Sequence, residues 1–124
     1  MAKKQPIRKS LQKRLIISPR YTQKLLEIAN YGYELFGAKV SDNFIAKIEN
    51  KVMALPKMPE IHPKNRFIES TEKKVFRNIL VNKYAVLYSV TARTICVITI
   101  YHTAINPETI KNFTTPPKNN TVQK

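Results

Sequence analysis

Three side chains in the second half of the chain could together promote the cleavage of a phosphodiester: Arg77, Tyr88 and His102. Attack of an RNA 2′-hydroxyl on its own phosphate requires a base, an acid for the leaving 5′-oxygen, and positive charge beside the phosphate. An arginine can supply the charge, and a histidine titrates near neutrality and can serve as acid or base. We therefore take Arg77, His102 and Tyr88 as candidate catalytic residues.

Four further residues are candidates for holding such a substrate. Lys64, Arg66 and Lys74 carry positive charge within the polar connection 60–74, and Tyr101 offers an aromatic surface on which a base can stack. Each candidate also has a structural interpretation. A charge inside an apolar strand must be paired or face a groove, and a buried tyrosine hydroxyl finds a partner within the fold.

Several classes of chemistry lack the residues that they need. The two histidines, His62 and His102, lie far apart in the sequence, and together with one cysteine and scattered carboxylates they match no metal-ligand spacing. The only glycines are Gly32 and Gly37, so no glycine-rich phosphate loop is present. We expect neither a metal nor a cofactor.

The candidate residues lie on or next to a stretch of three apolar runs, residues 75–107, which breaks at 82–83 and at 92–94. Runs of this length, rich in Val, Ile, Tyr and Thr, predict a three-stranded antiparallel meander. The middle run alternates, and its bulkier face is the one expected to be covered. That face carries Tyr84, Val86, Tyr88 and Val90.

The cover is predicted from the first half of the chain. Residues 15–17 suit a short first strand, and Ser18 is a good N-cap for a helix over 19–36 with a proline at its first position. Gly37 separates this helix from a second one over 38–55. We predict an α+β fold: an N-terminal strand, a two-helix hairpin and the meander, with a helical turn after the last strand.

Charge is concentrated at the two ends of the chain. Of 22 Lys plus Arg, six lie in residues 1–14 and two in 114–124, where there are no acidic residues, which leaves a net charge of +6 between them. We predict a flexible basic arm over 1–13, one domain over 14–113 and a flexible tail over 114–124. A pI near 10.1 favours polyanionic or acidic partners.

We also expect a soluble cytoplasmic protein. Cys96 lies alone in an apolar strand, as suits a reducing compartment. The basic N-terminus lacks the apolar region of a secretory signal, and the apolar runs are far shorter than the roughly 20 residues of a membrane span.

Four segments of the sequence, taken in order, carry a resemblance to a known family: SPRYTQKLLEIANYGYELFG, ALPKMP, FRNILVNKYAVLYSV and ITIYHTAINP. Arg77 lies on the first meander strand, Tyr84 and Tyr88 form a Tyr-x-x-x-Tyr on the next, and His102 begins a His-x-x-x-Asn-Pro after the last. This order resembles the RelE/ParE family of toxins from bacterial type II toxin–antitoxin systems, the plasmid stabilisation family.

The resemblance covers about residues 15–113 and implies an acidic antitoxin that binds across the hairpin or the sheet as a helix or an added strand. Such toxins divide between endoribonucleases that cut mRNA on the ribosome and inhibitors that poison DNA gyrase without being nucleases. The Arg77, Tyr88 and His102 set favours RNA binding and mRNA cleavage. However, Ala104 stands where such toxins often carry an arginine, which counts against RNA cleavage. Ribosome-dependent mRNA cleavage is the leading expectation, with gyrase inhibition as the alternative. A non-catalytic nucleic-acid-binding protein, or a degenerate toxin that only binds antitoxin, stays open.

Overall fold

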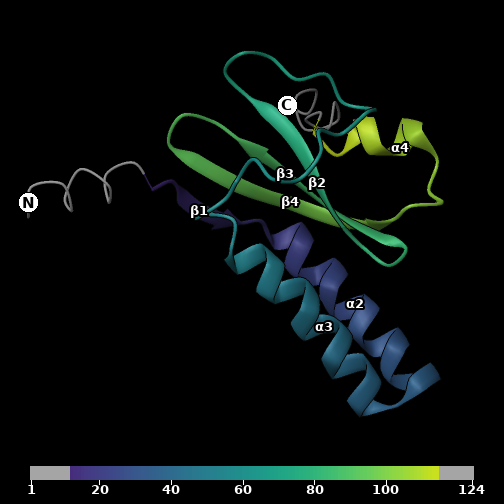
Figure 1. The fold of residues 1–124 in the computed structure, drawn as a ribbon. Helices are drawn as coiled ribbons and strands as arrows, with labels where there is room; N and C mark the ends of the chain where they lie inside the picture. Colours follow the sequence, from purple (N-terminus) through teal and green to yellow (C-terminus); the bar gives the residue numbers. More distant parts are fainter. Residues whose placement is uncertain (1–11, 115–124) are drawn as a thin grey trace, which may run out of the picture.

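The computed structural model describes residues 12–114 and contains one four-stranded sheet, a helical hairpin and a short C-terminal helix (Figure 1). Its elements are β1 (Arg14–Ile17), α2 (Pro19–Phe36), α3 (Ala38–Met53), β2 (Val75–Val81), β3 (Tyr84–Val90), β4 (Thr94–His102) and α4 (Pro107–Asn112). The predicted arm and tail lie outside the described residues, except for residues 12, 13 and 114. The predicted α+β fold is confirmed.

The strands follow the order β1-β4-β3-β2, with β1 parallel to β4 and the other neighbours antiparallel. The meander therefore lies where the sequence predicts it. β2 and β3 are joined by Asn82 and Lys83, and Asn82 has a positive φ of 54°. Asparagine tolerates this left-handed conformation, which tight hairpin turns require.

The helical hairpin begins and turns at the residues that its sequence indicates. Ser18 caps α2, and its side-chain oxygen accepts a hydrogen bond from the Tyr21 N–H at 3.2 Å. Gly37, at φ 91°, ends α2 and directly precedes α3. α3 ends at Met53, two residues before the predicted end, because the Leu55 N–H bonds to the Val52 carbonyl in a tighter turn.

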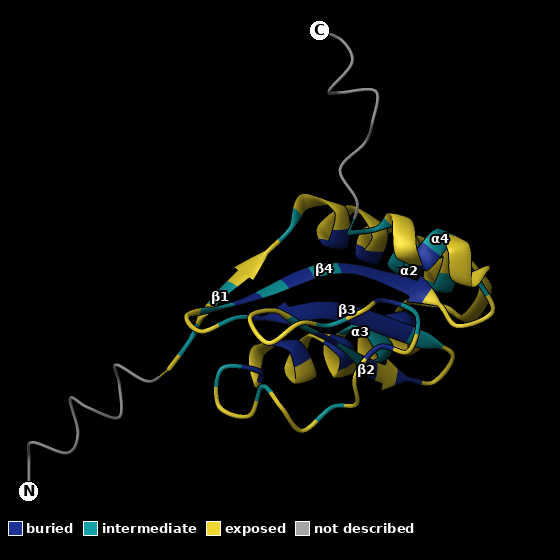
Figure 2. Cartoon of the chain, turned by 90° about the horizontal axis from the view of Figure 1, so that it is seen from above, coloured by how far each residue is buried: buried dark blue, intermediate teal, exposed yellow. Residues whose placement is uncertain are grey.

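The hairpin covers the bulkier face of the sheet, as expected. Residues from both helices and from β2, β3 and β4 form one buried cluster there, which Figure 2 shows in dark blue. Tyr88, Ile95 and Val97 have no exposed surface, and Ile48 of α3 is equally buried. Burial of this apolar surface is the main force that holds the hairpin on the sheet.

The opposite face of the sheet is also covered, which the alternation of β3 did not predict. Ala85 and Leu87 are fully buried on this side, under Ile68 of the connection before β2 and Ile110 of α4. The irregular connection and the last helix thus form a third layer. Within residues 12–114, no helix is both long and apolar enough to cross a membrane.

Candidate functional site

Arg77 and Tyr88 lie directly opposite each other in the β2–β3 register, on the hairpin side of the sheet. Both side chains donate hydrogen bonds to the loop that follows α3. The Tyr88 hydroxyl donates to the Pro59 carbonyl at 2.7 Å, and Arg77 Nη1 donates to the His62 carbonyl at 2.7 Å. The pair therefore fixes the loop on the sheet.

The same loop continues as a partner of the outer edge of β2. Lys64 forms a β-bridge with Arg77, and the N–H groups of Asn65 and Asn78 bond to the carbonyls of Phe76 and Pro63, at 2.8 Å and 3.0 Å. These bonds cover part of an edge strand whose backbone groups would otherwise be open to pairing. Lys64 is thereby placed beside Arg77, as one shared site would require.

Arg77 is a half-buried cation with no acidic partner among the described residues. Its Nε is buried and has no hydrogen-bond partner there. A buried donor without a partner lowers the stability of the fold unless an anion or another acceptor approaches it. Arg77 is therefore a candidate for contact with an anionic group.

The local environment shifts the pKa values of two side chains near Arg77, those of Tyr88 and His62. Burial raises the pKa of Tyr88 to about 12, with Glu60 adding to the rise and Arg77 opposing it. Burial lowers the pKa of His62, and the positive charges of Lys51 and Arg77 lower it further. The His62 ring meets the Tyr88 ring edge-on, with centroids 6.1 Å apart. At neutral pH both groups are therefore uncharged.

His102 lies far from this pair. It is opposite Tyr84 in the β3–β4 register, and Tyr84 is about 13 Å from Tyr88 along the strand. Its ring meets the Tyr84 ring at 5.3 Å, and its Nδ1 accepts the Ala104 N–H at 3.0 Å. His102 is exposed at the sheet end, so the structure does not bring it together with Arg77.

Tyr101 is buried on the opposite face of the sheet, in a network centred on Asn65. Asn65 Nδ2 donates to Asn78 Oδ1 at 2.9 Å and to the Tyr101 hydroxyl at 3.3 Å, and its Oδ1 accepts the N–H groups of Phe67 and Ile68. Burial raises the pKa of Tyr101, while these side-chain hydrogen bonds oppose the rise. A base could reach the Tyr101 ring only if these neighbours moved.

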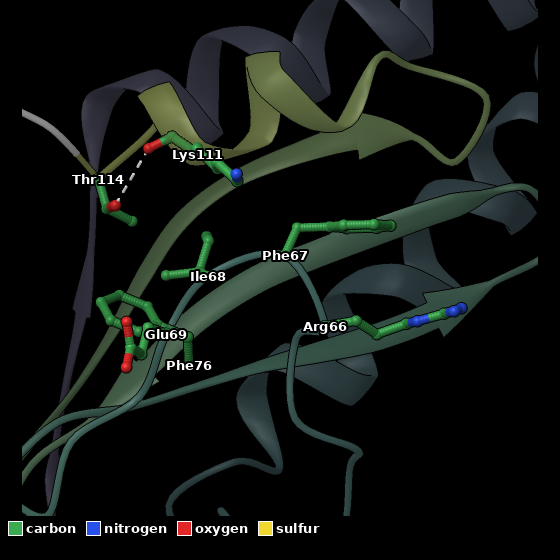
Figure 3. A pocket seen from close by; sticks show the side chains of 7 residues that line it. All are labelled: Arg66, Phe67, Ile68, Glu69, Phe76, Lys111 and Thr114. Carbon is green, nitrogen blue, oxygen red and sulfur yellow. Dashed lines mark hydrogen bonds between the residues drawn. The ribbon is translucent and has the colours of Figure 1, made fainter.

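Arg66 borders a groove on that same face, between α4 and the segment 66–69 (Figure 3). The groove has a volume of about 750 Å³, and Arg66, Phe67, Ile68, Glu69, Phe76, Lys111 and Thr114 line it. The Arg66 guanidinium lies 5.6 Å from the centre of the Phe67 ring. The groove thus places Arg66 and the Glu69 carboxylate beside apolar and aromatic surface, while Lys111 forms an ion pair with Glu108.

Lys74, the last substrate-binding candidate, lies immediately before β2 and is exposed. Its ammonium lies 6.0 Å from the centre of the Phe76 ring. The candidate residues therefore occupy four different parts of the molecule. Arg77 and Lys64 share one part, and Arg66, Lys74 and His102 each lie in another. They do not converge in one cleft.

A second groove, predominantly apolar, lies under the far end of the helical hairpin, where Figure 1 shows both helices projecting beyond the sheet. It has a volume of about 600 Å³, and Ile28, Tyr31, Phe36, Val40, Phe44, Tyr84 and His102 contribute to its lining. Phe36 is 64% exposed and Val40 53% exposed, although they continue the apolar faces of their helices. Exposed apolar side chains gathered at one groove make it a candidate interaction surface.

Sequence reasoning missed Asn65, Asn78 and the apolar groove. A signal for the groove was present, because Phe36 and Val40 continue the apolar faces of the two helices. Asn65 had only a weak signal, an asparagine in an irregular segment. No group of three or more His, Cys, Asp or Glu that could hold a metal ion occurs among residues 12–114.

The arrangement of strand, hairpin and meander is similar to that of a solved chain from a toxin–antitoxin system. A chain of the chromosomal ParDE TA system from P. aeruginosa superposes with a TM-score of 0.61 at 14% identity, covering 75% of this chain and 98% of that one. A chain of the archaeal RelE–RelB complex from Pyrococcus horikoshii OT3 gives a TM-score of 0.49 at 15% identity, covering 77% and 99%. We take the likeness of fold from the first of these.

The sequence profile of the ParE toxin of type II toxin–antitoxin system, parDE, matches residues 15–107. The chain therefore belongs to the ParE toxin family, and the predicted RelE/ParE membership is confirmed. No curated protein matches it in sequence.

Proposed function

We propose that this toxin arrests growth by poisoning DNA gyrase and does not cleave RNA. The observation that carries the proposal is the separation of His102 from Arg77. A metal-independent nuclease needs its proton donor within hydrogen-bond reach of the phosphate that its cation holds. About 13 Å of strand separates His102 from the Arg77–Tyr88 pair.

The protonation states also support a non-nuclease. The Tyr88 hydroxyl is bonded to the Pro59 carbonyl, and its raised pKa of about 12 makes it a poor base at neutral pH. His102 Nδ1 already accepts a backbone N–H. Ala104 supplies no second guanidinium next to His102. Poisoning of gyrase, which RelE/ParE-like toxins include among their activities, requires a binding surface and no such cluster.

Ribosome-dependent mRNA cleavage is the second candidate, and one observation favours it. The groove beside α4 combines Arg66 with Phe67 and Phe76, which could hold a phosphate and a base. It lies on the opposite face of the sheet from Arg77, so the two would not act on one phosphate.

We also propose that an acidic helix of the antitoxin occupies the apolar groove under the hairpin. Apolar side chains line this groove, and a formal net charge of +14 attracts an acidic partner. An amphipathic helix that lays its apolar face into such a groove is a common mode of recognition.

Induced expression in a bacterium tests the choice between the two activities. Total RNA is mapped at its 5′ ends, and plasmid topology is examined in the same cells, for the natural chain and for Arg77→Ala and His102→Ala. The proposal predicts intact messages with relaxed or cleaved plasmid DNA. New 5′ ends within translated messages, lost in His102→Ala, would overturn it in favour of RNA cleavage.

A further inference from the structure

We propose that one end of the sheet is a binding surface for the sugar–phosphate backbone of duplex DNA. We call it the basic end, and define it by Lys13, Arg14, Lys73, Lys74 and Arg93. The inference goes beyond the proposed function, because it concerns direct contact with DNA, and it does not depend on gyrase being the target.

The topology of the sheet gathers these cations. Arg14, the first residue of β1, is paired with Thr94, the first residue of β4, and Arg93 directly precedes it. On the far side of the sheet, Val75 begins β2 opposite the last residue of β3, so Lys73 and Lys74 come to the same end. Residues distant in sequence thus meet along one rim.

The basic end contains a groove of about 830 Å³, lined in part by Lys13, Lys73, Lys74 and Arg93 together with Glu60 and Glu72. Among residues 12–114, none of these four cations makes an ion pair, even with the two carboxylates of the groove. The Lys13 ammonium donates to the carbonyls of Thr91 and Ala92, at 2.8 Å and 2.9 Å. These bonds hold it at the rim and leave one N–H for a phosphate.

The sequence before the described residues adds charge of the same sign. Residues 1–11 contain four cations and no carboxylate. They attach to the domain at the basic end, because Gln12 and Lys13 lead directly into β1. The sequence that joins the basic end at Gln12 is thus itself basic.

The spacing of the cations suits a DNA groove. β1 and β2 are three strand spacings apart, so the backbones at Arg14 and Lys74 lie about 14 Å apart. The major groove of B-DNA is about 12 Å wide, so cations at the two sides can reach phosphates on either side of it. Arg93 lies between them, at the β3–β4 turn.

The lining favours duplex DNA over the other polyanions. None of its described residues is aromatic, so it lacks the platform on which single-stranded bases stack. Val75, Val90 and Ala92 contribute apolar area to the lining, but none of its residues is a large exposed apolar side chain of the kind that anchors a protein interface. Contacts to the phosphate backbone give affinity that depends on salt and little on sequence.

The test measures binding of the full-length protein to a fluorescent duplex of about 20 base pairs by anisotropy, from about 50 to 300 mM salt. The variant Lys73→Gln/Lys74→Gln/Arg93→Gln removes three charges from the basic end. The control Lys39→Gln/Lys47→Gln/Lys83→Gln removes three exposed charges from α3 and the opposite turn. Circular dichroism and thermal melting verify that both variants are folded.

The basic-end variant should bind DNA at least about tenfold more weakly, and its salt slope should be shallower by about 2.7, or 0.9 for each lost contact. The control should keep the natural slope. Equal weakening of both variants would overturn the proposal, because it would show a general effect of net charge. Equal or tighter binding of polyglutamate, weakened by the same three substitutions, would assign the surface to an acidic polypeptide instead.

Discussion

Arg77 and Tyr88 are cross-strand neighbours, and each donates a 2.7 Å hydrogen bond to a main-chain carbonyl of the loop that follows α3. In both cases the polar end of the side chain is used to hold the chain's own backbone. Two residues that sequence reasoning selected for catalysis therefore have a structural role in the described fold.

Removing the Tyr88 hydroxyl should weaken the fold and leave growth arrest intact. Tyr88→Phe loses the bond to the Pro59 carbonyl and keeps the buried ring, so the free energy of unfolding should fall by about 1 to 2 kcal/mol. Urea denaturation measures the change, and induced expression measures toxicity. Full loss of toxicity in a variant that remains folded would show that the hydroxyl acts in the chemistry.

The fold should lose stability in alkali through its buried tyrosines. Burial raises the pKa of Tyr88 from 10.0 to about 12, so the fold favours the neutral phenol. That contribution is fully present below pH 10 and is lost as the pH rises from 10 to about 12.

A difference of two pKa units corresponds to about 3 kcal/mol. Tyr88→Phe should therefore lose less stability over this interval than the natural chain, in urea unfolding at about pH 9 and about pH 11.5. Tyr21, whose pKa is also raised to about 12, is present in both proteins, so its contribution to the loss of stability cancels in the comparison. Parallel losses in the two proteins would contradict the assignment to Tyr88.

Asn65 should be one of the most sensitive polar positions in the chain. Asn65→Ala leaves the N–H groups of Phe67 and Ile68, the Tyr101 hydroxyl and Asn78 Oδ1 without this partner. The expected loss is about 3 kcal/mol of unfolding free energy. The exposed control Asn30→Ala should change stability by about 0.5 kcal/mol or less.

Equal effects of the two substitutions would mean that the network does not hold the connection before β2 on the sheet. Hydrogen exchange of the Phe67 and Ile68 amides gives a second, local readout. Both amides should exchange faster in Asn65→Ala than in the natural chain.

A charge in the apolar groove should abolish neutralisation without abolishing toxicity. Val40→Glu places a carboxylate in the groove lining, whereas Leu26→Glu changes a similarly exposed apolar residue outside it. Co-expression with the cognate antitoxin should restore growth for Leu26→Glu and fail for Val40→Glu. Rescue of both variants would exclude this groove as the antitoxin site.

Much of the fold could be predicted because its signals are local. Ser18 and Gly37 mark the ends of the first helix, and alternation along β3 identifies the face that the hairpin covers. The breaks between the three apolar runs coincide with the turns of the meander. Each of these signals acts within a few residues, so one sequence is sufficient to show them.

The third layer and the site could not be predicted in the same way. Asn65 fixes the connection through partners 13 and 36 residues away, and no local pattern encodes such contacts. The distance between His102 and Arg77 likewise depends on the register of three strands. The residue types alone suggested that Arg77, Tyr88 and His102 form a nuclease site. Only the strand register shows that His102 lies apart from the other two.

We propose that this chain acts on DNA gyrase and not on RNA. The most direct measurement is ATP-dependent supercoiling of a relaxed plasmid by purified gyrase, with increasing amounts of the purified full-length toxin and cleaved DNA measured in the same reactions. We predict that supercoiling stops and that cleaved plasmid accumulates. Unchanged supercoiling at a large excess of toxin, together with cleavage of mRNA on purified translating ribosomes, would contradict the claim.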